Sequence, residues 1–431
     1  MDNSIKTKYI QLKTQPAYAK VLHWGKLVSI TGSAQIIIQA VGFLSGILII
    51  RLLPVEEYAL YTLANTMLGT MTILSDGGIS SGVMAQGGKV WQDKEKLGAV
   101  LATGLDLRKK FAIGSLIVSI PILLYLLLDH GASWLTAVMI VLSLIPAFYA
   151  ALSDSLLEIV PKLHQAIAPL QKNQVMVSIG RLILNAGLLF VFPWTAVALV
   201  ANGIPRIYGN YKLHKIAEPY VVAERKPDPI VRKEILKIVR KIMPISIYYS
   251  LSGQIVFWIL SIFGNTNSIA QIGALGRLTQ LIAFFSTLIT VLVIPRFART
   301  ENDNKKIIRF FLYIQLLLLV ISLVIMVPVS VFPHQILWIL GESYENLNYE
   351  LILIMLSSCI GLFYSTSGNL ISSRAIILQP VILISLNISI LVGASFIWDL
   401  RTLNGILYYN LFYNLLMYIV TIAFFFIKID K

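Results

Sequence analysis

Apolar runs of about 20 residues recur from one end of the 431-residue chain to the other. A helix of that length crosses the roughly 30 Å hydrocarbon core of a bilayer. Only 13% of the residues are charged, whereas a soluble protein carries about 25%. The run lengths and the low charge together predict an all-α polytopic membrane protein.

About twelve spans are expected, each an apolar run between polar gaps. They cover residues 28–50, 58–76, 111–128, 134–153, 175–192, 194–211, 243–263, 269–294, 308–330, 350–370, 379–397 and 404–427. The gap at 79–110 is too polar to cross the membrane, and we expect it to form an amphipathic helix at the surface. Almost no sequence outside the spans is long enough to build a soluble domain.

Lysine and arginine are distributed unevenly between the two sides of these spans. Of the 35, 29 fall in the N-terminal tail, in the gaps after even-numbered spans or at the C-terminus, and Arg206 and Arg309 lie near the span ends on the same side, which brings the total to 31. The opposite side holds only Arg51 and Arg401. The positive-inside rule therefore places both termini in the cytoplasm. The formal net charge of +14 follows this topology, and no gap resembles a nucleic-acid-binding module, so nucleic acid is not an expected partner.

The two halves of the chain resemble each other weakly. "SAQIIIQAVGFLSGIL" (33–48) matches "SGQIVFWILSIFG" (252–264), and a second pair of segments lies at a similar offset. A repeat of six spans preserves orientation, so the halves are expected to form two six-helix lobes related by a pseudo-two-fold axis along the membrane normal. Two such lobes around a central cavity are typical of a transporter.

The longest cytoplasmic gap falls at the middle of the chain, where it contains three prolines and many basic residues. It is expected to be the linker between the lobes. The predicted parts are a cytoplasmic N-terminus (1–27), an N-lobe (28–211), a basic linker (212–242), a C-lobe (243–427) and a cytoplasmic C-terminus (428–431).

Catalytic and metal chemistry find little support in the residues. The single cysteine, Cys359, lies in an apolar run, and the five histidines are scattered without ligand spacing, so neither a metal nor a cofactor is expected. A membrane-embedded polysaccharide polymerase needs catalytic acids or a sizeable extramembrane loop. The longest outer loop, 331–349, is short, and its acids Glu342 and Glu345 are interpreted as solvated.

Arginine is the cation found deep in the expected spans. Arg181 and Arg277 both lie well inside an apolar run, where a charged side chain is costly and tends to face a polar interior. For Arg181, snorkelling or a hydrogen bond between helices is an equally good explanation. Arg206 and Arg374 lie near cytoplasmic span ends. Two interpretations of each remain: it is a topological signal, or it contacts a ligand that enters from the cytoplasm.

Carboxylates are expected only at span ends. Asp76 closes the second span. We interpret it as an interfacial or helix-end group in preference to a proton carrier. No aspartate or glutamate lies deep in a predicted span, although a carrier of organic cations would bury one as a counter-charge. Guanidinium groups pair bidentately with phosphate or carboxylate, so the expected cargo is anionic.

Two segments resemble a known family. "RLLPVEEYALYTL" (51–63) is similar to the end of the first span of polysaccharide and O-antigen flippases, and "ILSDGGISSGVMAQGGK" (73–89) resembles the end of their second span. These flippases belong to the multidrug/oligosaccharidyl-lipid/polysaccharide exporter superfamily. Departures from their pattern are Pro54 and Ala59, both where glycine is usual.

The resemblance implies a flippase that moves an undecaprenyl-diphosphate-linked oligosaccharide repeat from the cytoplasmic to the outer leaflet by alternating access. It implies a bacterial cytoplasmic (inner) membrane, with membrane lipids, a polysaccharide polymerase and a chain-length regulator as further partners. In related flippases, arginines of the first and eighth spans face the cavity. Arg277 matches the eighth-span position and Arg51 approximates the first.

The substrate contacts predicted from charge and resemblance together are Arg277, Arg181, Arg51, Arg206 and Arg374. Coupling or gating candidates are Asp76 and Glu57, since Glu57 approximates the acid that opens the second span in those relatives. Two roles are predicted for Arg51. It forms an ion pair with Glu56 or Glu57, or it contacts a diphosphate that leaves the cavity on the outer side. A multidrug or cation antiporter of the same fold is the alternative function, and a polysaccharide polymerase is a more distant one.

Overall fold

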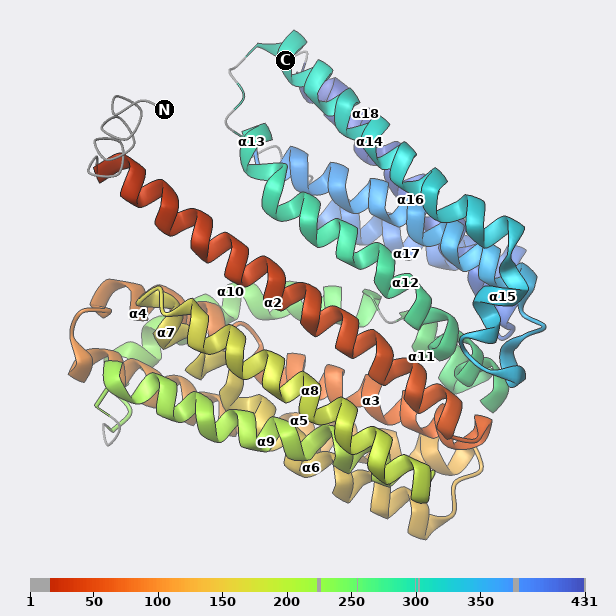
Figure 1. Cartoon of the computed structure of the whole chain (residues 1–431), viewed down its shortest axis with the longest axis horizontal. Coiled ribbons are helices and arrows are strands. Elements are labelled where there is room, and N and C mark those ends of the chain that lie inside the picture. The colour runs from red at the N-terminus through yellow and green to blue at the C-terminus, as the bar shows by residue number, and fades with distance from the viewer. Residues whose placement is uncertain are drawn as a thin grey trace, which may run out of the picture. The chain divides into compact units, whose positions relative to one another are not determined.

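The computed structural model describes residues 16–222, 226–253, 255–298, 300, 303–374 and 380–429, and the described chain is helical without strands. Parts of the predicted tails and linker (1–15, 223–225 and 430–431) lie outside these residues. The first half contains α2 (Pro16–Leu52), α3 (Val55–Asp76), α4 (Ile79–Val90), α5 (Lys94–Asp129), α6 (Trp134–Leu157), α7 (Ile159–Leu163), α8 (Ile167–Val191), α9 (Thr195–Ala217) and the 3₁₀ turn η1 (Glu218–Tyr220) (Figure 1).

The second half contains α10 (Pro229–Gly253), α11 (Ile255–Phe263), α12 (Thr266–Leu292), α13 (Ile294–Ala298), α14 (Asn304–Val331), α15 (Pro333–Trp338), η2 (Glu342–Tyr344), α16 (Asn348–Ser372), α17 (Pro380–Ile397) and α18 (Leu403–Ile429). Where the structure describes them, the expected spans fall on helices, and the seventh is divided between α10 and α11. Within the described residues, eight helices are long and apolar enough to cross a membrane. The chain is therefore an all-helical polytopic membrane protein, as its hydropathy predicts.

Residues 79–110 do not form the predicted surface helix. They form α4 and the first half of α5, which continues without a break into the third expected span. The physical reason is a buried stripe of helical period on α5 that includes Leu97, Leu101 and Leu107, so this polar stretch packs into a protein core. The predicted linker is likewise largely helical, because α9 extends to Ala217 and α10 begins at Pro229.

The chain divides into two compact units. Unit 1 comprises 1–45, 64–125 and 133–251, and unit 2 comprises 46–63, 126–132 and 252–431. The division falls inside α2, α3, α5 and α10, so one end of each of these helices belongs to unit 2. In particular, the whole "RLLPVEEYALYTL" segment (51–63) is grouped with the C-terminal part of the chain.

Unit 1 is a bundle in which α9 packs against both α6 and α8, and α4 packs against α7 (Figure 1). Its core joins Ile79 and Val83 of α4 to leucines of α5 and to Ile235 and Val239 of α10. The turn between α3 and α4 requires glycine, because Gly78 has a φ of 96° and a Cβ there would lie 2.9 Å from Ile242 Cγ2.

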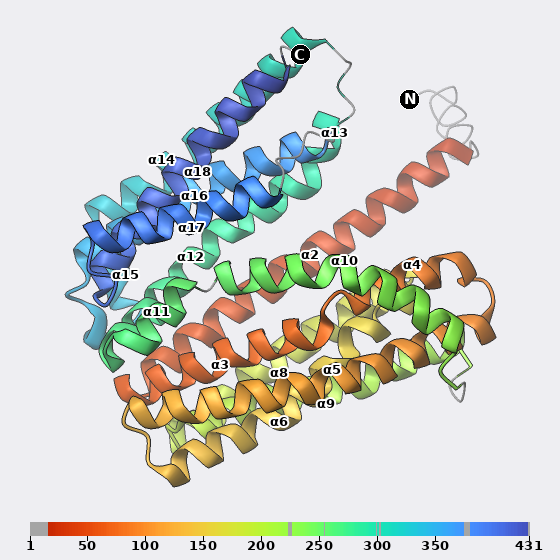
Figure 2. The same cartoon turned by 180° about the vertical axis from the view of Figure 1, so that it is seen from behind.

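Unit 2 is organised around α16, which packs against α12, α14 and α18 (Figure 2). The rings of Phe311 on α14 and Phe425 on α18 stack with centroids 4.3 Å apart, and both are buried. Many outward-facing positions on α14 are large and apolar, among them Leu316, Val320 and Val324. Such exposed apolar stripes are expected of helices that face lipid.

Candidate functional site

Arg277 is held in unit 2 by two tyrosines. It lies on α12, is partly buried, and forms side-chain hydrogen bonds with Tyr58 and Tyr61 near the start of α3. These tyrosines are three residues apart, so they share one face of the helix. Gly46 of α2 leaves room for the arginine, because a Cβ there would lie 3.2 Å from Arg277 Cδ.

The side chains that form these hydrogen bonds with Arg277 are phenols and not carboxylates. Among the residues that the structure describes, no ion pair within 4.0 Å involves Arg277. A phenol orients a guanidinium without cancelling its charge. The site therefore keeps a positive charge next to fixed hydroxyl groups, which suits a phosphate or carboxylate ligand.

Tyr58 is fixed from a second direction by Tyr344 of η2. Both side chains are buried, and their rings meet edge to face with centroids 6.5 Å apart. Burial is the main cause that raises the pKa of Tyr344, and charge interactions with Tyr58 and Glu56 raise it further. This phenol therefore stays neutral. Glu56 and Glu57 lie in the first turn of α3, where acids favour the helix dipole.

Arg51 makes a contact that differs from both predicted roles, the ion pair with Glu56 or Glu57 and the contact with a departing diphosphate. Its Nε donates to the carbonyl oxygen of Ile339 at 2.9 Å, and its second terminal nitrogen donates to that of Trp338. The guanidinium also lies over the Trp338 ring, 4.6 Å from the centroid. Arg51 thus binds the end of α15, where a cation favours the helix dipole, although its side chain stays exposed.

The predicted arginines do not share their described contacts. Arg374 follows α16 and donates to the carbonyl oxygens of Thr300 at 3.0 Å and Phe297 at 3.4 Å, near the end of α13. Arg181 is partly buried on α8 of unit 1. Arg277, Arg51 and Arg374 belong to unit 2, but the contacts described for each involve different elements.

A buried ion pair that sequence reasoning missed lies in unit 1. Arg108 of α5 is only 2% exposed and contacts Asp76 Oδ1 at 3.2 Å. The same guanidinium donates to Ser80 at 3.2 Å and to Ser155. Asp76 in turn accepts from the Ser80 backbone N–H at 3.1 Å, which caps α4. The helix-end role predicted for Asp76 agrees with this geometry.

A second ion pair joins α6 to α9. Arg206 Nε lies 2.9 Å from Asp154 Oδ2, and Asn210 donates to the other carboxylate oxygen at 2.6 Å. Asp154 lies inside the candidate span Trp134–Leu163, one residue beyond the predicted span end. The sequence prediction places carboxylates only at span ends; Asp154 directly follows the predicted end of the fourth span, and Arg206 neutralises it.

Two features of the sequence point to functional residues that are not among the predicted site residues. Leu97, Leu101 and Leu107 share a helical face with Arg108, which extends the third span towards the N-terminus. Tyr58 and Tyr61 repeat at helical spacing within the family-like segment. Within the described residues, no group of three or more histidine, cysteine, aspartate or glutamate side chains is placed to hold a metal ion.

Comparison with known proteins extends these observations. No protein-family model matches the chain, and no curated protein sequence matches it. Among solved structures, the chain is similar to one described as the inward-facing conformation of a multidrug resistance MATE family transporter of the MOP superfamily. That similarity has a TM-score of 0.71 and 15% identity over 91% of this chain and 94% of that one.

Two further structures have the same fold. A MATE structure in complex with MaD3S aligns with a TM-score of 0.64 and 16% identity, over 94% of this chain and 95% of that chain. A MOP superfamily transporter from Pyrococcus furiosus, described as having a binding pocket of reverse polarity that suggests a different function, aligns with a TM-score of 0.63 and 17% identity over 94% of each chain. These likenesses show that the chain has the fold of the MATE transporters of the MOP superfamily.

Proposed function

We propose that this protein is a flippase that carries an undecaprenyl-diphosphate-linked oligosaccharide from the cytoplasmic to the outer leaflet of a bacterial inner membrane. The observation that supports this proposal is Arg277, a partly buried guanidinium whose recorded partners are the phenols of Tyr58 and Tyr61. A cargo with a diphosphate supplies a negative charge that can pair with this guanidinium.

In this proposal, Arg277 binds diphosphate oxygens with its terminal nitrogens. Tyr58 and Tyr61 hold the guanidinium in one orientation, and Tyr344 holds the Tyr58 ring. The charged headgroup and sugars cross by alternating access, while the polyprenyl tail stays in lipid. Binding in a partly dehydrated site strengthens a guanidinium–phosphate contact, because water screens it less than it does at the surface.

The other predicted residues take different parts in the proposed cycle. Arg181 is a further candidate contact for the anionic headgroup. Arg51, Arg206 and Arg374 already bind protein groups, so a ligand contact from any of them requires that bond to open. Asp76 and Glu57 remain candidates for coupling or gating. A polymerase and a chain-length regulator are the expected partners downstream of the flipped product.

A multidrug transporter is the second candidate, and two observations favour it. One neighbour in fold is described as a multidrug resistance transporter, and Asp154 places a carboxylate within a candidate span. The ion pair between Asp154 and Arg206 argues against this function, since a paired carboxylate must first lose its partner before it can bind a cationic drug.

Arg277→Ala is the direct test. We expect the variant to insert into the membrane normally, to lose export of the surface glycan, and to accumulate lipid-linked repeat units in the inner leaflet. Arg277→Lys is expected to recover only part of the export, because an ammonium cannot reproduce the bidentate contact. Export is measured as surface glycan in cells, and flipping as outer-leaflet exposure of the lipid-linked repeat in reconstituted vesicles.

Arg309→Ala is the matched control, because Arg309 of α14 is an exposed arginine of the same unit. It is expected to leave export unchanged. Normal glycan export by a stably inserted Arg277→Ala protein would refute the proposal. Unchanged glycan export together with a marked change in susceptibility to cationic drugs would favour the multidrug transporter instead.

A further inference from the structure

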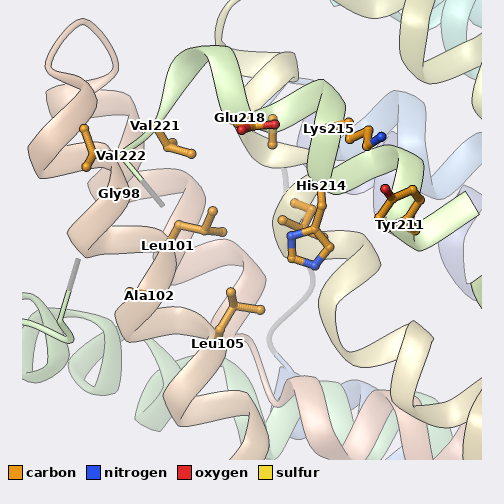
Figure 3. A pocket seen from close by; sticks show the side chains of 12 residues that line it. Gly98, Leu101, Ala102, Leu105, Tyr211, His214, Lys215, Glu218, Val221 and Val222 are labelled. Carbon is orange, nitrogen blue, oxygen red and sulfur yellow. The ribbon is translucent and has the colours of Figure 1, made fainter. Parts of the chain in front are cut away.

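Unit 1 contains a cavity that no predicted site residue lines. It has a volume of about 330 Å³ and lies between α5 and the end of α9. Its size is at the lower end of the roughly 300–1,000 Å³ typical of small-molecule sites. Figure 3 shows Leu101 and Leu105 of α5 on one side, with Tyr211, His214 and Lys215 of α9 on the other.

The wall of the cavity is apolar and its rim is polar. Leu101, Leu105, Leu157 and Val221 supply hydrocarbon surface, whereas Lys215 and Glu218 lie where α9 passes into η1. This combination suits an amphipathic ligand, with a hydrocarbon part inside and a charged part at the edge.

The exposed face of α9 leads towards this cavity. Val200, Ile204, Tyr208 and Tyr211 are exposed at helical spacing, which forms a stripe expected to face lipid. The stripe ends in two cation–aromatic pairs. Lys212 lies 4.9 Å from the centroid of Tyr208, and Lys215 lies 4.7 Å from that of Tyr211. Tyrosine and lysine together are typical of the boundary between hydrocarbon and headgroups.

The charge at the rim favours an anion. Glu218 is the carboxylate that interacts with Lys215, whereas Lys212 donates to Met176 Sδ at 3.3 Å, so the two ammonium groups outnumber this carboxylate. Hydrogen bonding and charge interaction with Tyr211 raise the pKa of Lys215, so its ammonium stays protonated. Partial burial lowers the pKa of His214 more than the charge of Asp154 raises it, which favours a neutral imidazole in the cavity wall.

We propose that this cavity binds an anionic phospholipid, with an acyl chain against the leucines of α5 and the headgroup phosphate on Lys215. The lipid reaches the cavity along the exposed stripe of α9, on the side where the positive-inside pattern predicts the cytoplasm. Its acyl chain also contacts Val221, next to Val222, whose N–H donates to the Lys94 carbonyl oxygen at 3.1 Å. Bound lipid therefore stabilises the contact of Val221 and Val222 with the start of α5.

Binding is tested on the full-length protein in detergent with phosphatidylglycerol and phosphatidylcholine as probes, by native mass spectrometry. Phosphatidylglycerol is expected to bind more tightly than phosphatidylcholine and to raise the thermal unfolding midpoint. Lys215→Gln is expected to weaken phosphatidylglycerol binding about fivefold, the effect of one interfacial lysine. Lys172→Gln, which removes an exposed lysine of α8, is the matched control and is expected to change little.

Ala102→Phe tests the cavity itself, because Ala102 lines it and a larger side chain there occupies the space of the acyl chain. We expect weaker binding of both lipids. Equal effects of Lys215→Gln and Lys172→Gln would overturn the assignment of the phosphate. Unchanged binding by a folded Ala102→Phe protein, or competition by glycerol phosphate as strong as by the whole lipid, would overturn the assignment of the acyl chain.

Discussion

The arginines of the two units are satisfied in different ways. In unit 1, Arg108 and Arg206 each contact a carboxylate, at 3.2 Å and 2.9 Å. In unit 2, Arg277 is held by two phenols, and Arg51 and Arg374 donate to backbone carbonyl oxygens. The described contacts therefore cancel the charge of Arg108 and Arg206, whereas those described for Arg277 and Arg51 are with neutral groups.

This difference separates structural arginines from a candidate binding arginine. The carboxylate partner of a buried guanidinium already compensates the free-energy cost of removing that charge from water. An anionic ligand therefore gains little binding free energy from contacting such a guanidinium. A guanidinium held by neutral groups keeps its attraction for an anion. Loss of Arg108 is therefore expected to affect folding, whereas loss of Arg277 is expected to affect transport, as proposed above.

Arg108→Ala has the largest expected effect on stability. It leaves Asp76 with a weakened set of partners and opens a buried space, which costs about 3 kcal/mol of unfolding free energy. The expected readout is a clear fall in the thermal unfolding midpoint in detergent. Lys110→Ala, two residues away, removes an exposed ion pair with Asp106 and is expected to cost less than about 1 kcal/mol. Equal losses in the two variants would contradict the structural role of Arg108.

Gly46→Val tests the position of Arg277 without changing any charge. A valine side chain would contact Arg277 Cδ and displace the guanidinium from its two tyrosines. We expect a several-fold loss of glycan export and a cost of about 1 kcal/mol in stability. Gly42→Val is the control on the same helix, because a Cβ at Gly42 meets nothing within 4 Å. If both variants export equally, the placement of Arg277 does not limit transport.

Arg51→Ala distinguishes a helix-end contact from a gate. The variant loses two hydrogen bonds to the end of α15 and the contact with Trp338, which together stabilise an exposed site by about 1 kcal/mol. We therefore expect a small decrease in thermal stability and normal export. Arg401→Ala serves as the control, since Arg401 is the other predicted outer-side cation. Strong loss of export in a protein of unchanged stability would instead make Arg51 part of the export path.

His214 gives the smallest expected effect. Its pKa is lowered in the folded protein, chiefly by partial burial, so the unfolded chain binds more protons on acidification. Its contribution to stability is fully present above the ordinary histidine pKa, near 6.5, and is lost as the pH falls through the lower folded value. Thermal midpoints measured between pH 8 and pH 5.5 should fall less in His214→Gln. Parallel pH profiles would show that other groups dominate this range.

The hydropathy of the chain predicts the helices well, because each span depends on local and additive properties. The described residues of the twelve expected spans fall on helices, and Pro54 lies in the break between α2 and α3. The polar start of α5 was misassigned because average polarity conceals a buried stripe on one face.

The sequence by itself determined that this is an all-helical membrane protein and that its deep predicted charges are arginines. Only the tertiary structure decided which group each arginine contacts. Arg51 binds a carbonyl oxygen 288 residues away, and Arg206 binds a carboxylate 52 residues away. Insertion depends on the hydrophobicity of each segment alone, whereas the partner of a buried charge depends on which helices pack together. The distinction between Arg108 and Arg277 is therefore a property of packing.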